Sequence, residues 1–208
     1  MKFYVSGIKI ICVMKIKTII FDLDGTVVEN EYDWQAIRRE IGVEGGSILS
    51  YLDSLAEPVR SEKYALLKKH EEEQTEKAVL KEGIKELLAE LKNKGIKRAL
   101  VTNNSLENTA LLLKKFELEF DLVMTRESGL HKPTAEPFRA VMKHFNSSPE
   151  ETLAVGDTNY DVLAAREAEI KHVFILKSKM TPVKMEGAEL VSAISELDRR
   201  IKELLAEN

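Results

Sequence analysis

The sequence of 208 residues is poor in cysteine, with Cys12 alone. One cysteine cannot form a disulfide within the chain, and proteins of oxidising compartments commonly rely on disulfides. We therefore expect a cytoplasmic protein.

Long apolar runs are also missing. The opening stretch, MKFYVSGIKIICVM, is interrupted by Lys9 and followed by Lys15, and no small-residue cleavage site comes after it. A membrane-spanning helix needs about 20 predominantly apolar residues. We expect neither a signal peptide nor a membrane span.

No stripe of basic residues is present. The 31 Lys and Arg are interspersed with 35 Asp and Glu, and the net charge is −4. Nucleic-acid-binding domains usually carry a basic face, so we expect no nucleic-acid partner. An anionic substrate would have to be bound by locally placed cations.

Residues 1–13 are interpreted as an N-terminal extension. Two readings are open for them: an extra edge strand of the sheet, or an upstream extension of a protein whose working start is Met14. The second is favoured, because the sequence from Met14 reads MKIKTIIFDLDGT and begins one strand-length before the first motif.

That first motif combines a buried strand with two acids. Ile19 to Phe21 form an unbroken apolar run, typical of a strand covered on both faces of a parallel sheet. Asp22 and Asp24 follow two residues apart, so both carboxylates project from the same side while the chain stays extended. Gly25 then permits a turn. In open α/β sheets such a strand end is where ligands bind.

Residues 29–78 lack the strand pattern and read as a small helical insertion. Asp33 can cap a helix that ends at Gly42, and the Gly45–Gly46 link precedes two further helices, over 48–55 and from Pro58 to about Thr75. The charged run HEEEQTEK at 70–77 predicts a solvated helical face.

The remaining sequence alternates strands and helices, which predicts a parallel, doubly wound sheet. Residues 14–28 and 79–208 are therefore assigned to an α/β, Rossmann-like core, and 29–78 to an all-helical cap inserted after the first strand. Further strands are expected at 96–101, 120–124, 153–155 and 173–176, and helices at 82–94, 106–116, 136–145, 161–168 and 192–205.

Four short motifs occur in a fixed order: DLDGT at 22–26, VTNN at 101–104, HKP at 131–133 and VGDTNYD at 155–161. Each is next to an apolar strand or a helix start. With these motifs the chain resembles the haloacid dehalogenase superfamily of phosphohydrolases, and its phosphoglycolate phosphatase-like branch with a small helical cap. The resemblance implies a Mg²⁺-dependent phosphatase that hydrolyses a small phosphate monoester, a phosphoglycolate-like acid or a sugar phosphate, through an aspartyl phosphate.

Asp22 is the candidate nucleophile, since a carboxylate that forms an aspartyl phosphate divides one difficult step into two easier ones. Its alternative is a plain metal ligand. Asp24 is placed to exchange a proton with the leaving alcohol and then with water; its alternative is to bond the turn at Gly25 and Thr26. Dehalogenases of the superfamily lack an acid at this position, which favours phosphoryl chemistry.

By resemblance, Mg²⁺ is held by Asp22, the backbone carbonyl of Asp24, and Asp157. Asp161 lies behind them or binds the metal through a water. Its alternative is an acid favoured in the first turn of a helix. Hard oxygen ligands of this kind suit Mg²⁺.

The phosphoryl oxygens require a cradle of donors. Thr102 offers a hydroxyl, the backbone amides of Asn103 and Asn104 add donors, and Lys132 adds a fixed positive charge. On the cap, Arg38 and the loop around Glu44 are expected to contact the rest of the substrate.

Tyr32 and Trp34 are interpreted as packing within the cap rather than as substrate contacts. As partners we expect a small-molecule phosphate ester, with the protein a monomer or a homodimer. Two rival functions stay open: a sugar-phosphate mutase with the same nucleophile, and a non-catalytic interaction protein that retains the fold.

Overall fold

The apolar run before the acid pair forms the central strand of the molecule. In the computed structural model, which describes residues 2–5, 8–11, 16–178 and 185–206, β3 (Thr18–Phe21) is buried along its whole length. It pairs in parallel with β6 (Lys97–Val101) on one side and with β8 (Thr152–Gly156) on the other. A strand with neighbours on both sides and helices over both faces must be apolar throughout, as Ile19 to Phe21 are.

The main sheet has six parallel strands in the order β10-β9-β8-β3-β6-β7. The outer strands are β7 (Leu122–Met124), β9 (His172–Leu176) and β10 (Glu189–Val191). The chain winds outward from β3 in both directions, so the strand order reverses beside β3. The doubly wound, Rossmann-like α/β fold is thereby confirmed.

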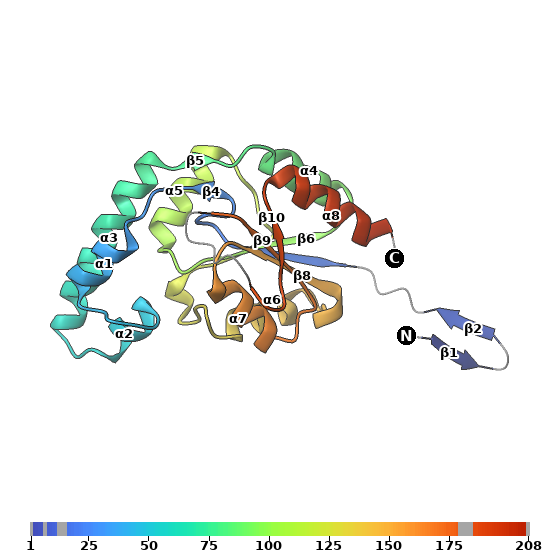
Figure 1. The fold of residues 1–208 in the computed structure, drawn as a ribbon, viewed down its shortest axis with the longest axis horizontal. Helices are drawn as coiled ribbons and strands as arrows, with labels where there is room; N and C mark the ends of the chain where they lie inside the picture. Colours follow the sequence, from blue (N-terminus) through green and yellow to red (C-terminus); the bar gives the residue numbers. More distant parts are fainter. Residues whose placement is uncertain (1, 6–7, 12–15, 179–184, 207–208) are drawn as a thin grey trace.

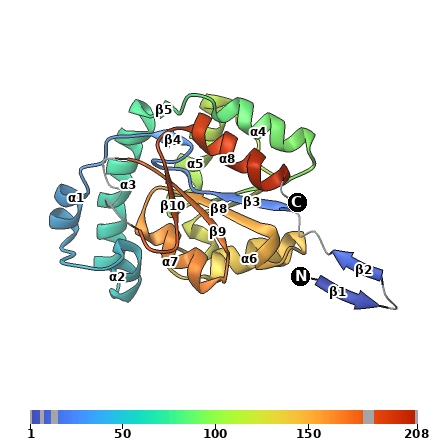
Figure 2. The ribbon, with the colours of Figure 1, turned by 45° about the vertical axis from the view of Figure 1, so that its right-hand side comes forward.

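Helices cover both faces of this sheet (Figure 1). One face carries α4 (Ile84–Asn93), α5 (Leu106–Phe116) and α8 (Ile194–Ala206); the other carries α6 (Glu136–Phe145) and α7 (Asn159–Glu167). Figure 2 shows α4 and α8 together above the sheet and α6 below it. Two short 3₁₀ turns, η1 (Arg126–Ser128) and η2 (Pro149–Glu151), complete the core.

The insertion predicted after the first strand consists of α1 (Trp34–Ile41), α2 (Ile48–Ser54) and α3 (Val59–Lys77). The chain leaves and re-enters the core through a two-stranded antiparallel ribbon, β4 (Val28–Glu29) with β5 (Val79–Leu80). The three helices share an apolar cluster separate from the two clusters of the core. They lie beyond the carboxyl ends of the main strands (Figure 1), so any ligand there is enclosed between sheet and helices.

Local chemistry explains the limits of α1. Asp33 accepts a hydrogen bond from the backbone of Ala36 at 2.9 Å, and Gly42 ends the helix in the left-handed conformation at φ 90°. Both helix ends were predicted from the sequence and are confirmed.

Three features differ from the sequence prediction. The solvated face expected at 70–77 is only partly correct, because Glu71 and Thr75 are buried on the inner side of α3. The strands β4, β5 and β10 were not predicted. Residues of the N-terminal segment form β1 (Lys2–Val5) and β2 (Ile8–Ile11), which pair with each other, and neither strand belongs to the six-stranded sheet.

The expected start at Met14 lies outside the described residues, and the boundaries at 13, 28 and 78 remain predictions. Within the part of the chain that the structure describes, no helix combines the length and apolar character that crossing a bilayer requires.

Candidate active site

The acids of the first and last motifs meet where the strand order reverses. Asp22 follows β3 directly, Asp157 follows β8, and the backbone N–H of Asp22 donates to the carbonyl of Val155 at 2.9 Å. Parallel neighbours bring their carboxyl ends to one edge of the sheet, so residues 135 positions apart become adjacent. Both side chains are buried beneath the helical insertion.

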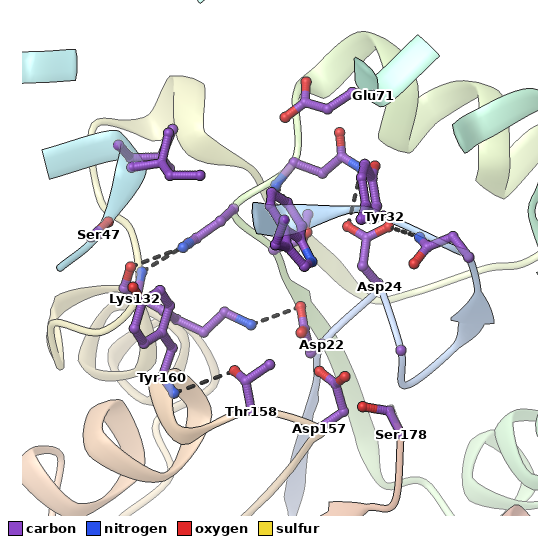
Figure 3. Close-up of a pocket in the computed structure, with 18 of the residues that line it drawn as sticks. Asp22, Asp24, Tyr32, Ser47, Glu71, Lys132, Asp157, Thr158, Tyr160 and Ser178 are labelled. Atoms are coloured by element: carbon purple, nitrogen blue, oxygen red, sulfur yellow. Dashed lines mark hydrogen bonds and ion pairs between the residues drawn. The ribbon is translucent and has the colours of Figure 1, made fainter. Parts of the chain in front are cut away.

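Lys132 contacts two acids, Asp22 (Figure 3) and Asp161. Its Nζ is 2.7 Å from Oδ1 of Asp22 and 2.6 Å from Oδ1 of Asp161, and the residue is 3% exposed. Its backbone is fixed by a reciprocal pair of hydrogen bonds with the Asn103 side chain, both 2.9 Å long. Burial opposes the charge of Lys132, but Asp161 and Asp22 outweigh it and hold the lysine pKa above its ordinary value. The ammonium group is therefore a permanent positive charge beside Asp22.

Asp161 is fully occupied by contacts of its own. Its Oδ1 contacts Lys132, and its Oδ2 accepts from the Thr158 hydroxyl at 2.8 Å and from the Thr158 backbone at 3.1 Å. The bond from the Thr158 backbone is one half of the capping box at the start of α7. Gly156 permits the close approach, since a Cβ there would lie 2.2 Å from the Asp161 carboxyl carbon. Asp161 thus fixes Lys132 and the helix start together.

Three carboxylates are close enough to share a cation. Asp22, Asp157 and Asp161 each offer an oxygen, and these oxygens all lie within 4.8 Å of one another. Burial raises the pKa of Asp157 to about 7, with the charge of Asp161 adding to the effect and Ser178 opposing it. Burial likewise holds the Asp22 pKa well above its usual range, although Lys132 lowers it. One ammonium group cannot offset three buried carboxylates, and the donor set fits a hard divalent cation.

Gly25 provides the space that Asp157 occupies. Its φ is +78°, and a Cβ at this position would lie 2.1 Å from Oδ2 of Asp157. The glycine is thus required twice, for the left-handed turn and for the contact.

Asp24 is held by two amide side chains from opposite sides of the cavity. Asn104, after β6, donates to its Oδ2 at 3.0 Å, and Asn30, after β4, donates to its Oδ1. The orientation of Asn104 is defined because its own oxygen accepts from the Ser105 backbone at 2.8 Å. Burial raises the Asp24 pKa and outweighs the lowering effect of both amides. The sequence analysis missed both side chains; only the position of Asn104 within VTNN hinted at a role.

The predicted phosphate cradle is present in part. Thr102 is 2% exposed at the end of β6 and lines the cavity with Asn103 and Lys132. The backbone N–H of Asn104, however, already donates to the Thr102 hydroxyl at 3.0 Å. That amide is therefore occupied, which corrects the expectation that it is a free donor.

The helical insertion closes the cavity, whose volume is about 980 Å³. Arg38, expected to contact substrate, lines the cavity; it also donates to the carbonyl of Gly46 at 2.5 Å and to the Tyr160 hydroxyl at 3.4 Å. Tyr160 also donates to Gly46, at 2.9 Å. Arg38 therefore fixes the glycine loop against α7. Glu44 lines the cavity and is exposed.

Tyr32 and Trp34 stack with ring centroids 4.5 Å apart and pack on the apolar cluster of the insertion. This agrees with their predicted packing role. Both also line the cavity, as does the buried Glu71 of α3, which the sequence analysis did not identify as a site residue.

The comparisons with known proteins agree with this geometry. The model of the haloacid dehalogenase-like hydrolase family matches residues 28–175, which include three of the four motifs. A candidate pyrophosphatase, PpaX, of Caldanaerobacter subterraneus subsp. tengcongensis is 33% identical over 181 residues, covering 78% of this chain and 82% of that protein.

Two solved structures are similar in fold. A subfamily IA hydrolase of the superfamily from Geobacter sulfurreducens is 25% identical with a TM-score of 0.60, covering 91% of this chain and 96% of its own. CbbY from Rhodobacter sphaeroides, solved in complex with phosphate, is 22% identical with a TM-score of 0.69. The match covers 88% of this chain and 96% of the CbbY chain. The chain belongs to the haloacid dehalogenase-like hydrolases. Within them it is a phosphatase.

Proposed function

We propose that the protein is a Mg²⁺-dependent phosphatase that hydrolyses a small phosphate monoester through a phosphorylated Asp22. The observation that carries this proposal is the unequal environment of the two Asp22 oxygens. Oδ1 accepts from the Leu23 backbone and from Lys132, both at 2.7 Å, whereas Oδ2 has no hydrogen bond among the described residues. A carboxylate anchored through one oxygen presents the other as a positioned nucleophile.

In the first step, Oδ2 of Asp22 attacks phosphorus while the bond from phosphorus to the leaving oxygen breaks. Lys132 lies within contact of Asp22, so it can attract the phosphoryl oxygens as charge shifts onto them. Thr102 and Asn103 line the same part of the cavity. These three residues are the proposed phosphate-binding group.

Asp24 supplies the proton that the leaving alkoxide needs. Its raised pKa favours the protonated acid, and it lines the same cavity as Asp22. In the second step the same carboxylate accepts a proton from water, whose oxygen attacks phosphorus and releases Asp22. Such general acid–base catalysis is typically worth 10²- to 10⁴-fold.

Asp22, Asp157 and the backbone carbonyl of Asp24 are the proposed ligands of Mg²⁺, with Asp161 behind them. When bound, Mg²⁺ neutralises the phosphoryl charge and the nucleophile together. The fit rests on three clustered carboxylates with one lysine as their buried counter-charge.

The substrate is proposed to be small, because the cavity of about 980 Å³ is covered by the insertion. A phosphorylated acid or sugar fits this volume. The PpaX relative is named as a pyrophosphatase, so pyrophosphate, a phosphoanhydride, should be tested together with the esters.

The test is release of inorganic phosphate from a panel of small phosphate esters and pyrophosphate, with Mg²⁺ and with EDTA. We expect turnover of at least one ester that is lost in EDTA and restored by Mg²⁺. Turnover that is unaffected by EDTA would contradict the proposed requirement for Mg²⁺. Hydrolysis of pyrophosphate but of no ester would show that the substrate is a phosphoanhydride and not a phosphate monoester.

A sugar-phosphate mutase is the remaining rival, because it would use the same Asp22 and Asp24. It would return the phosphoryl group to a substrate hydroxyl instead of to water. Phosphate release without a bisphosphate activator supports the phosphatase, whereas isomerised sugar phosphate without phosphate release supports the mutase.

A further inference from the structure

The cavity contains a second buried acid that the proposed chemistry does not use. Glu71 projects from α3, and the residue is 3% exposed. The buried stripe of α3 consists of Leu67, Glu71 and Thr75, spaced four residues apart. An apolar side chain would complete this stripe at lower desolvation cost, so the carboxylate at position 71 requires an explanation.

The two oxygens of Glu71 have different environments. Oε1 accepts from Nη1 of Arg126 at 2.5 Å, while Oε2 is buried and has no hydrogen-bond partner among the described residues. Arg126 also lies 5.7 Å from the Tyr64 ring, and both line a small surface groove on the outer side of α3. Glu71 itself lines the active-site cavity. The arginine therefore pairs with Oε1, and Oε2 is the buried oxygen of this cavity-lining residue that has no donor among the described residues.

A buried carboxylate oxygen without a donor is unfavourable by roughly 1–3 kcal/mol or more. Burial raises the pKa of Glu71 to about 7; Arg126 lowers it but does not compensate, and Asp24 raises it further. The influence of Asp24 on this pKa indicates that the two carboxyl groups lie near each other. Figure 3 agrees, since Tyr32 and Asp24 are drawn between Glu71 and the Asp22–Asp157 pair.

We propose that Glu71 selects the substrate by accepting a hydrogen bond, through Oε2, from a hydroxyl group on the leaving alcohol. This rests on the proposed function and narrows it to phosphorylated polyols. A carboxylate on the leaving group would be repelled by both Asp24 and Glu71, although Lys81 also lines the cavity. An ammonium group would meet the Arg126 charge behind Glu71. A neutral hydroxyl satisfies the oxygen without adding charge.

The experiment measures kcat/KM for two matched pairs of esters: glycerol 1-phosphate with propyl phosphate, and erythritol 4-phosphate with butyl phosphate. We expect the wild type to prefer the hydroxylated member of at least one pair by tenfold or more. Sites built to bind a hydroxyl reject analogues that lack it, because the buried acceptor is then left unpaired.

The preference should depend on Glu71. In Glu71→Met it should fall to within about threefold of unity, while Glu73→Met, an exposed position on the same helix, should keep the wild-type preference. Glu71→Gln keeps an acceptor for Arg126 and serves as the second variant if Glu71→Met does not fold. It places an amide N–H₂ where the free oxygen was, so it should also reduce the preference.

The outcomes separate this inference from the proposed function. If no ester in the panel is hydrolysed, the phosphatase proposal itself fails. If both members of each pair are hydrolysed equally, or if the preference survives in Glu71→Met, the phosphatase stands and the role of Glu71 is overturned. A preference for ethanolamine phosphate over glycerol 1-phosphate would also overturn it, in favour of a cationic leaving group.

Discussion

The two sides of the cavity differ in the chemical groups that they present to a ligand. On the sheet side, Lys132 contacts two acids, and Asp161 is bonded through both oxygens. On the helical side, Glu71 is buried with one oxygen unpaired among the described residues. The sheet side carries groups that any phosphate ester needs, and the helical side carries a group whose partner must come from the leaving alcohol.

The difference follows from the architecture. The acids follow the ends of strands that are held in place by the hydrogen bonds of the sheet. The residues that would contact the phosphoryl group are therefore positioned before substrate binds. The helices connect to the core through the β4–β5 ribbon, through the packing of α3 against α5, and through side-chain contacts such as Arg38 with Tyr160. We infer that the core determines the reaction and the insertion determines the substrate.

Removing the charge of Lys132 should have the largest effect. Lys132→Ala leaves two buried acids without their counter-ion, and we expect kcat/KM to fall at least a hundredfold. Steady-state phosphate release checks this, with Lys114→Ala on the outer part of α5 as the control for a lysine lost outside the site. A loss below fivefold would return Lys132 to a structural role.

The contact between Gly25 and Asp157 can be isolated with a matched glycine. Gly95 has a similar φ, +71°, but a Cβ there meets nothing within 4 Å. Gly95→Ala should cost about 1–2 kcal/mol, the strain of a left-handed alanine. Gly25→Ala adds the displacement of Asp157, so we expect a larger loss of thermal stability and at least tenfold weaker activation by Mg²⁺. Equal melting temperatures and equal Mg²⁺ dependence in the two variants would contradict the contact.

The environment of Glu71 should be visible in the pH dependence of stability. Its ordinary pKa is 4.5, and in the folded protein it is about 7, so the folded state binds an extra proton between these values. The shifted pKa of Glu71 therefore stabilises the folded state fully below pH 4.5, and this stabilisation is lost as the pH rises to 7. Relative to Glu71→Gln, the wild type should lose up to about 3 kcal/mol across that interval.

Urea unfolding of the two proteins at pH 4.5, 5.5, 6.5 and 7.5 provides the measurement. Arg126, Asp24 and Glu127 also act on Glu71, so the difference between the two proteins is the informative quantity. The free energy of unfolding of the wild type minus that of Glu71→Gln should fall as the pH rises. If this difference does not change with pH, or if it increases, Glu71 is ionised over the whole pH range.

The smallest effect is expected at the N-terminus. A chain that begins at Met14 should melt within about 4 °C of the full chain, because β1 and β2 pair with each other and not with the six-stranded sheet. Roughly 1 kcal/mol corresponds to 2–4 °C for a protein of this size. A drop of more than 8 °C in a thermal melt would favour the reading of this segment as part of the core sheet.

Much of the fold could be predicted because local pattern and burial agree. The helices over 106–116 and 136–145 have the predicted bounds, since their apolar residues recur at helical spacing. Ser105 caps the first, and a proline lies in the first turn of the second. The strand β10 was missed because Glu189–Val191 has only three residues and no apolar run.

The acids were predictable for a different reason: their motifs follow strands, and strand ends converge. Glu71 could not be predicted as a site residue. The run HEEEQTEK has polar or charged residues at every position, so it does not indicate which face of the helix is buried. Its burial depends on how α3 packs over the core, which is a tertiary property. The amides of Asn30 and Asn104 likewise meet at Asp24 only through loop geometry.

Chemical trapping at Asp22 tests the central claim most directly. The reaction is quenched during turnover of the best ester and reduced with borohydride, which converts an aspartyl phosphate to homoserine, and the product is mapped by peptide mass spectrometry. We predict homoserine at position 22 in the wild type and none in Asp22→Asn, whose phosphate release should fall at least a thousandfold. Homoserine at Asp24 or Asp157, or an Asp22→Asn variant that still releases phosphate at near the wild-type rate, would contradict the account.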